Sequence, residues 1–123
     1  MNARDFASKL QATFRAGQVM NNPGGSTSII LSIGEDRIVY QRGRSRFYIS
    51  IDTLYSTYSR FMGSNVTTAE LKLFWPEIFD PRHNGHSCHW TFLFMVLKEL
   101  GIVQAIRGRG VAGDPFNVMI SAT

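Results

Sequence analysis

The chain has 123 residues, of which 44% are hydrophobic and 18% charged, the size and composition of one folded domain with its own core. This excludes a disordered chain, and no apolar stretch approaches the roughly 20 residues of a membrane-spanning helix. The net charge of +4, carried mostly by ten arginines, favours an anionic partner, and the single cysteine, Cys88, excludes an intrachain disulfide. We therefore predict a soluble, cytoplasmic protein whose single domain spans residues 1–123.

The N-terminal residues 1–17 are predicted to form a helical arm. Phe6, Leu10 and Phe14 recur every fourth residue and so share one apolar face of a helix. Residues 18–27, rich in Asn, Gly and Pro, are predicted to be a flexible link to the α+β body at 28–120. We expect the apolar stripe to pack either on the body of the same chain or on a second subunit of a homodimer.

Three short β segments are predicted next, at 28–33, 37–41 and 46–51. They are separated by turn sequences at 34–36 and 42–45, which favours a three-stranded antiparallel meander. From Asp52 the spacing of apolar residues changes to the helical period of about 3.6. The remaining predicted elements are helices at 52–62, 67–75 and 87–100 and a C-terminal β-hairpin at 102–107 and 116–120. The fold class predicted from this order is α+β.

Local signals support two of these helices. Thr67 followed by Glu70 has the spacing of a capping box, in which each side chain bonds the other residue's backbone N–H. The last helix is mostly core, but Ser87, Thr91 and Lys98 line up as a narrow polar strip. Phe94 and Met95 lie beside this strip and are predicted to be exposed, which makes them a second candidate surface for a homodimer.

The three helices and the hairpin with its glycine-rich, arginine-bearing loop resemble a winged helix-turn-helix domain over residues 47–120. In this resemblance, residues 47–51 form the short strand that pairs with the wing. The resemblance implies binding to duplex DNA, with the third helix in the major groove and the wing on the backbone. The side chains implied to face the groove are His86, Ser87, Thr91 and Lys98. The implied wing contacts are Arg107 and Arg109.

The turn Arg42-Gly43-Arg44-Ser45-Arg46 is the strongest candidate binding site. Three arginines within five residues repel one another, and a nearby phosphate stabilises them. The loop containing Arg107 and Arg109 repeats this chemistry. The alternative is that these arginines form a solvated surface that keeps the protein soluble. Four tyrosines have the spacing of half-buried core residues, with stacking on bases as the alternative: Tyr40, Tyr48, Tyr55 and Tyr58.

All three histidines and the cysteine fall within seven residues, as His83, His86, Cys88 and His89. Thiolate and imidazole are usual zinc ligands, but a structural zinc site normally draws its ligands from two separated segments. We interpret the cluster as a polar loop and helix N-terminus, with nucleic-acid contacts or a metal site as alternatives. No residue is assigned a catalytic role and no cofactor is predicted.

The leading functional prediction is a small basic nucleic-acid-binding protein, with duplex DNA as its ligand, serving as a regulator or accessory factor. Its contacts to phosphate would come from the two arginine-bearing turns. One alternative is a protein-interaction or dimerisation module without enzymatic activity. The other is a metal-dependent nuclease that uses the cluster from His83 to His89.

Overall fold

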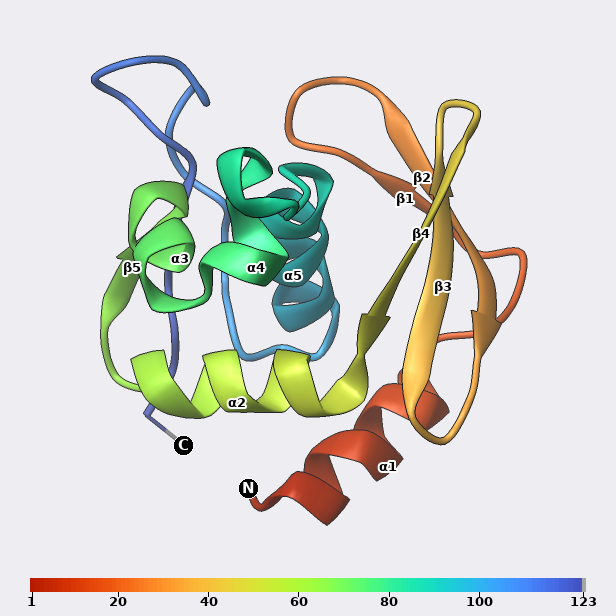
Figure 1. Ribbon diagram of the computed structural model, residues 1–123. Coiled ribbons are helices and arrows are strands. Elements are labelled where there is room, and N and C mark those ends of the chain that lie inside the picture. Colours follow the sequence, from red (N-terminus) through yellow and green to blue (C-terminus); the bar gives the residue numbers. More distant parts are fainter. Residues whose placement is uncertain (123) are drawn as a thin grey trace. The chain divides into compact units, whose positions relative to one another are not determined.

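The computed structural model describes residues 1–122, and the α+β class predicted from the sequence is confirmed. The chain divides into two compact units, the first comprising Met1–Arg60 and the second beginning at Phe61. Within residues 1–122, no helix combines the length and the apolar character needed to cross a bilayer. Figure 1 shows the elements of both units in sequence colours.

The first unit contains a four-stranded antiparallel sheet in the order β1-β2-β3-β4. Its strands are β1 (Val19–Asn21), β2 (Thr27–Ile33), β3 (Arg37–Arg42) and β4 (Ser45–Ser50). The last three confirm the predicted meander to within one residue at each end. Prediction missed β1, which pairs with β2 and makes the sheet four-stranded rather than three-stranded.

The predicted flexible link therefore contains a strand and an ordered turn, which corrects the interpretation of residues 18–27. The side chain of Asn22 is buried and joins both ends of the turn, because its amide donates to Ser26 and its carbonyl accepts from the Ser28 hydroxyl, each at 2.8 Å. The Asn-, Gly- and Pro-rich composition thus specifies a β1–β2 turn rather than a flexible segment.

The two faces of this sheet differ in burial. One face is core and carries Met20, Ile30, Ile38, Tyr40 and Ile49, all buried. We call the opposite side the outer face, which comprises Val19, Asn21, Thr27, Ile29, Ser32, Arg37, Val39, Gln41, Arg46, Tyr48 and Ser50. Along β3 and β4, buried and accessible residues alternate because successive side chains point to opposite faces of a strand.

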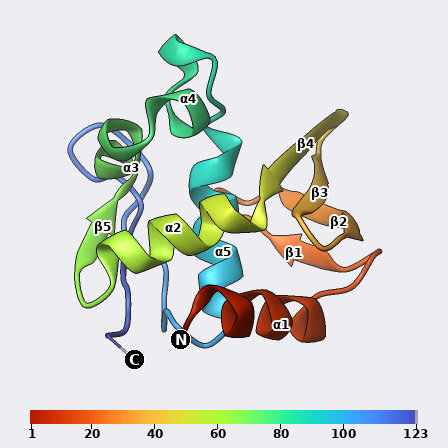
Figure 2. The same cartoon turned by 60° about the horizontal axis from the view of Figure 1, so that its bottom comes forward.

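Two helices complete the first unit, α1 (Ala3–Thr13) and α2 (Ile51–Phe61), whose last residue already belongs to the second unit. Phe6 of α1 is fully buried, and its ring centre lies 5.6 Å from that of Tyr55 and 5.5 Å from that of Tyr58, both on α2. Leu10 and Phe14 are also buried. The apolar stripe of the predicted arm therefore packs within its own chain, and Figure 2 shows α1 beside α2.

The second unit is built from short elements around one longer helix. These are β5 (Asn65–Thr67), α3 (Thr68–Phe74), α4 (Pro76–Phe79), the 3-10 helix η1 (Pro81–His83), α5 (Cys88–Glu99) and β6 (Asn117–Met119). The predicted capping box is confirmed, since Glu70 N donates to the Thr67 hydroxyl at 3.2 Å and Thr67 N donates to the Glu70 carboxylate at 3.1 Å. Residues 76–83, for which no helix or strand is predicted, form two short helical turns.

The predicted C-terminal hairpin is wrong in its pairing. β6 pairs with β5, and residues 102–107 form no strand. The consecutive residues Ile102 and Val103 are both buried, whereas neighbouring residues of a strand point to opposite faces. One β-bridge, Arg107 to Asn117, joins this segment to β6, and a backbone hydrogen bond from Ser121 N to the Ile102 carbonyl connects its other end. Likewise, β4 pairs with β3, so residues 47–51 are not the strand that pairs with the wing.

Candidate nucleic-acid interface

The β3–β4 turn presents its arginines through a two-residue loop. Arg42 pairs with Ser45 and closes the turn, leaving Gly43 and Arg44 at its tip. Gly43 has a φ of +61°, which suits the first position of a type II′ turn and is strained for a residue with a Cβ. The tight turn therefore holds Arg44 at the end of the hairpin, where the residue is exposed.

The three arginines of this turn do not share one face. Arg46 pairs with Gln41 on the outer face and is exposed. Arg42 has the strand parity of Tyr40, lies on the core side and is half-buried. The predicted cluster is therefore divided: Arg44 and Arg46 remain accessible at the tip and on the outer face, while Arg42 is partly enclosed.

The charge on the strands of this sheet is one-sided, although the exposed Glu35 and Asp36 directly precede β3. None of the four strands contains an aspartate or a glutamate, whereas β3 and β4 carry Arg37, Arg42 and Arg46. Within residues 1–122, neither Arg44 nor Arg46 forms an ion pair. The two guanidinium groups therefore have no carboxylate of their own to neutralise them, and an external anion can take that role.

An exposed aromatic ring lies on the same face. Tyr48 is 63% exposed, and the guanidinium of Arg37 lies over its ring, 5.0 Å from the ring centre. Tyr40 and Tyr58 are fully buried and Tyr55 is half-buried, as expected of core residues. Tyr48 is the exception. The sequence itself indicates this, because Tyr48 alternates with Phe47 and Ile49 and so points to the opposite face of the strand.

The second arginine-bearing loop lies in the second unit and differs in charge. The Arg109 side chain donates to the Asp114 carboxylate at 3.0 Å, so this arginine already has an anionic partner. Gly108 and Gly110 have φ values of +90° and +72°. A Cβ on Gly108 would collide with the Pro115 backbone. Both exposed arginines, Arg107 and Arg109, are thus carried by a tightly folded loop with one internal ion pair.

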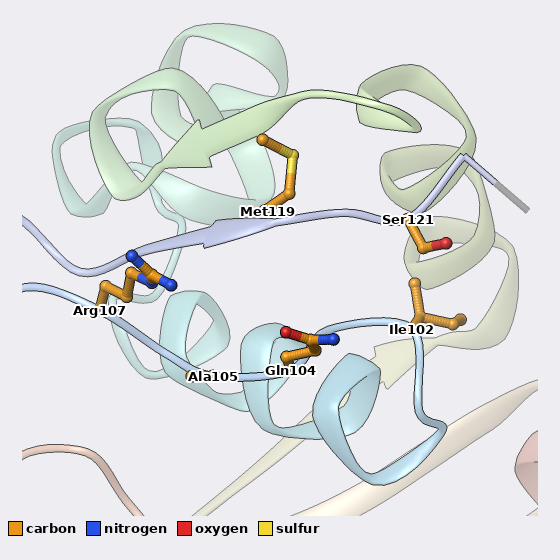
Figure 3. A pocket seen from close by; sticks show the side chains of 6 residues that line it. All are labelled: Ile102, Gln104, Ala105, Arg107, Met119 and Ser121. Carbon is orange, nitrogen blue, oxygen red and sulfur yellow. The ribbon is translucent and has the colours of Figure 1, made fainter.

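A pocket of about 280 Å³ lies between residues 102–107 and β6. Figure 3 shows Arg107, Gln104 and Ile102 on one side and Met119 and Ser121 on the other. Backbone hydrogen bonds connect the two segments near both ends of the pocket, where Arg107 and Asn117 exchange two bonds and Ser121 N donates to the Ile102 carbonyl. The side chain of Met119 lines the pocket from β6.

Helix α5 does not offer the surface that the winged-helix resemblance implies. Thr91, predicted to face the major groove, is only 5% exposed, and Phe94 and Met95, predicted to be exposed, are buried. The reason is that α5 is apolar on all sides, which is the pattern of a buried helix. His86, Ser87 and Lys98 are exposed, but without Thr91 they form no continuous strip along the helix. Phe94 and Met95 are therefore no candidate surface for a homodimer.

The members of the histidine cluster differ in burial. His83 and His86 are exposed, whereas His89 is buried on α5, its ring centre 5.5 Å from that of His86. Burial and the neighbouring His86 lower the pKa of His89 to about 4, so its ring is neutral near pH 7. Among residues 1–122, no three His, Cys, Asp or Glu side chains are grouped so as to hold a metal ion.

An ion pair between Asp80 and Arg82 stabilises the turn just before His83. Asp80 is buried and accepts hydrogen bonds from the Arg82 guanidinium at 3.2 and 3.3 Å and from its backbone N–H at 3.0 Å. These bonds lower the pKa of the Asp80 carboxyl. Gly85 lies against this turn, and a Cβ there would be 2.6 Å from the backbone nitrogen of Asp80. These residues thus have structural roles.

Comparison with known proteins adds no family to this description: no family model matches the sequence, and neither the curated proteins nor the solved structures contain a match.

Proposed function

We propose that this protein binds nucleic acid through phosphate contacts made by the β3–β4 hairpin. The observation that carries the proposal is the pair Arg44 and Arg46, two exposed guanidinium groups without an ion pair within residues 1–122, on a sheet whose strands contain no acidic residue. Surface arginines held without counter-charges favour an anionic ligand.

Phosphate fits these side chains better than an isolated carboxylate does. A guanidinium presents a planar set of N–H donors that matches two phosphate oxygens at once. A nucleic acid supplies phosphates at regular intervals, so Arg44 at the tip and Arg46 two residues along can each bind one. Binding of this type releases counterions and weakens steeply as salt is added.

The loop with Arg107 and Arg109 gives weaker support, because Asp114 already pairs with Arg109. The order β5, α3, α5 and β6, with α4 and η1 inserted between α3 and α5 and with β5 paired to β6, is compatible with a winged-helix arrangement in the second unit. The burial of Thr91 argues against base reading from α5. We therefore propose contacts to the backbone, with little preference for sequence, and not a groove-reading helix.

Fluorescence anisotropy with labelled oligonucleotides tests the proposal, titrated at about 50 and about 200 mM salt, where phosphate-driven binding differs steeply. The variant Arg44→Ala/Arg46→Ala should bind more weakly and with a flatter salt dependence, by about one in the log–log slope per arginine removed. The matched control is Arg4→Ala/Arg15→Ala, which removes the same charge from exposed positions outside the sheet. Absence of binding at both salt concentrations would overturn the proposal.

A further inference from the structure

The outer face of the sheet combines an exposed ring with flanking cations. Down the β3–β4 pair, the outer-face residues form three successive rows, which are Gln41 with Arg46, Val39 with Tyr48, and Arg37 with Ser50. Neighbouring rows are about 7 Å apart, because they are two residues apart along each strand. Tyr48 therefore lies in the middle row, with one arginine in the row on each side.

The ring of Tyr48 is held in place from one side. Its exposed fraction is 63%, and the Arg37 guanidinium lies 5.0 Å from the ring centre. A cation over a ring face is attracted by the negative charge density of that face. A flat side chain that is both exposed and positioned by a neighbour offers a ready surface for stacking.

Apolar side chains extend this surface toward the edge of the sheet. Val19 on β1 is 59% exposed and pairs with Ile29 on β2, which pairs in turn with Gln41. The outer face thus has an apolar and aromatic centre, with Arg37 and Arg46 beside it and no carboxylate among its residues. A purely acidic ligand would contact the arginines but would have no group to stack on Tyr48 or to cover the apolar side chains.

We propose that the outer face of this sheet binds single-stranded nucleic acid, with a base stacked on Tyr48 and phosphates on Arg46 and Arg37. The inference rests on the proposed function and names the form of its ligand. In a duplex, the faces of the bases are covered by their neighbours and only their edges are open to the grooves. An exposed ring can stack only on an unpaired base, which is how sheet surfaces with aromatic residues bind single strands.

The test separates stacking from phosphate binding. Anisotropy is measured with a labelled oligo-dT of about 15 nucleotides, an abasic deoxyribose-phosphate strand of equal length, and a duplex of that length. The wild-type protein should bind oligo-dT roughly 5- to 100-fold more tightly than the abasic strand, the range expected for a stacked base. It should also bind oligo-dT more tightly than the duplex.

Variants of Tyr48 identify the ring responsible. Tyr48→Ala and Tyr48→Thr should bind oligo-dT no more tightly than the abasic strand, whereas Tyr48→Phe should keep the wild-type difference. Threonine favours the β conformation, so the Tyr48→Thr variant replaces Tyr48→Ala in the test if the alanine variant folds poorly. The matched control is Leu73→Ala, which removes another exposed apolar side chain, 83% exposed on α3, and should leave binding unchanged.

The possible failures are distinguishable. Unchanged oligo-dT binding by Tyr48→Ala, together with weakened binding by Arg44→Ala/Arg46→Ala, would overturn the stacking inference and leave phosphate binding intact. Tighter binding to the duplex than to oligo-dT would also overturn the inference. A protein that binds none of the three ligands at low salt would overturn both proposals, and the outer face would then suit an acidic protein partner.

Discussion

The guanidinium of Arg37 lies 5.0 Å from the centre of the Tyr48 ring, so a cation already covers one face of an exposed tyrosine. Arg37 is the first residue of β3 and Tyr48 lies on β4, so the pair crosses two adjacent strands. The contact positions the ring without burying it, since Tyr48 stays 63% exposed.

Replacing Arg37 should affect binding more than stability. Arg37→Ala should lower the free energy of unfolding by no more than about 1 kcal/mol, the usual size of an exposed cation–π contact. Its binding to oligo-dT should show a salt slope smaller by about 0.7, the value for one lost phosphate contact on a single strand. Urea denaturation and salt-dependent anisotropy measure the two effects. Arg37→Lys keeps the charge and should retain the slope; an unchanged slope in Arg37→Ala would remove this residue from the interface.

The burial of Phe6 predicts a large cost for its removal. Phe6→Ala should destabilise the protein by about 3–5 kcal/mol, because a fully buried ring is replaced by a cavity beside Tyr55 and Tyr58. Lys9→Ala, an exposed position on the same helix, should change stability by no more than about 0.5 kcal/mol. Both are measured by urea denaturation. Because the stripe packs within its own chain, the destabilisation should not depend on protein concentration; a dependence would indicate packing between subunits.

The capping box at the start of α3 should contribute measurable stability. Thr67→Ala removes the hydroxyl that accepts from Glu70 N and should cost about 1 kcal/mol. Thr67→Ser keeps the acceptor and should cost much less. Thermal or urea unfolding of the two variants gives the comparison. Equal stability of the alanine and serine variants would mean that the cap is not stabilising in solution.

Acidification should destabilise the protein through His89. Its folded pKa is about 4 and its ordinary value is 6.5, so in this range the unfolded chain binds a proton that the folded chain does not. Stability is therefore full above about pH 6.5 and falls as the pH drops toward 4, by up to about 3 kcal/mol.

The variant His89→Gln removes this titration, so its unfolding free energy should differ less between about pH 7 and about pH 4.5 than that of the wild type. His83→Gln, at an exposed position, should keep the wild-type dependence. Asp80 acts at lower pH: its lowered pKa stabilises the fold above the ordinary value of 3.8, and this contribution is lost as the pH falls below that value. An identical pH dependence in wild type and His89→Gln would refute the assignment to His89.

The meander and the capping box were predictable because both are local. Alternating side chains and turn residues specify β2 to β4, and two residues three positions apart specify the cap. Of the three-residue strands, β6 lies within the strand predicted at 116–120, although its predicted partner was wrong. β1 and β5 were not predictable, because β1 lies among turn-forming residues and β5 is too short to show alternation. Their existence depends on partners elsewhere in the chain, which a local pattern does not reveal.

The candidate site was predictable in part. The arginine turn was found from composition, but the strand register decides that Arg46 and Arg42 lie on opposite faces. The spacing of the tyrosines predicts a half-buried Tyr48, but its alternation with Phe47 and Ile49 indicates the face of the strand that points away from the core. On α5, the position of Thr91 among apolar residues predicts an exposed polar strip, but Thr91 is buried. A hydroxyl can be satisfied within the helix itself, so one threonine does not define an exposed strip.

The pairing of β5 with β6 joins Thr67 to Asn117, fifty residues further along the chain. The sheet of the first unit, in contrast, is closed by hairpins between consecutive strands. During synthesis from the N-terminus, the β1–β4 sheet can therefore form as soon as its own residues have emerged. β5 must remain an unpaired strand until residues 117–119 have been made, because these residues form its partner β6. A ribosome slowed between residues 67 and 117 would thus prolong the exposure of an open strand edge, a surface prone to pairing with the wrong chain.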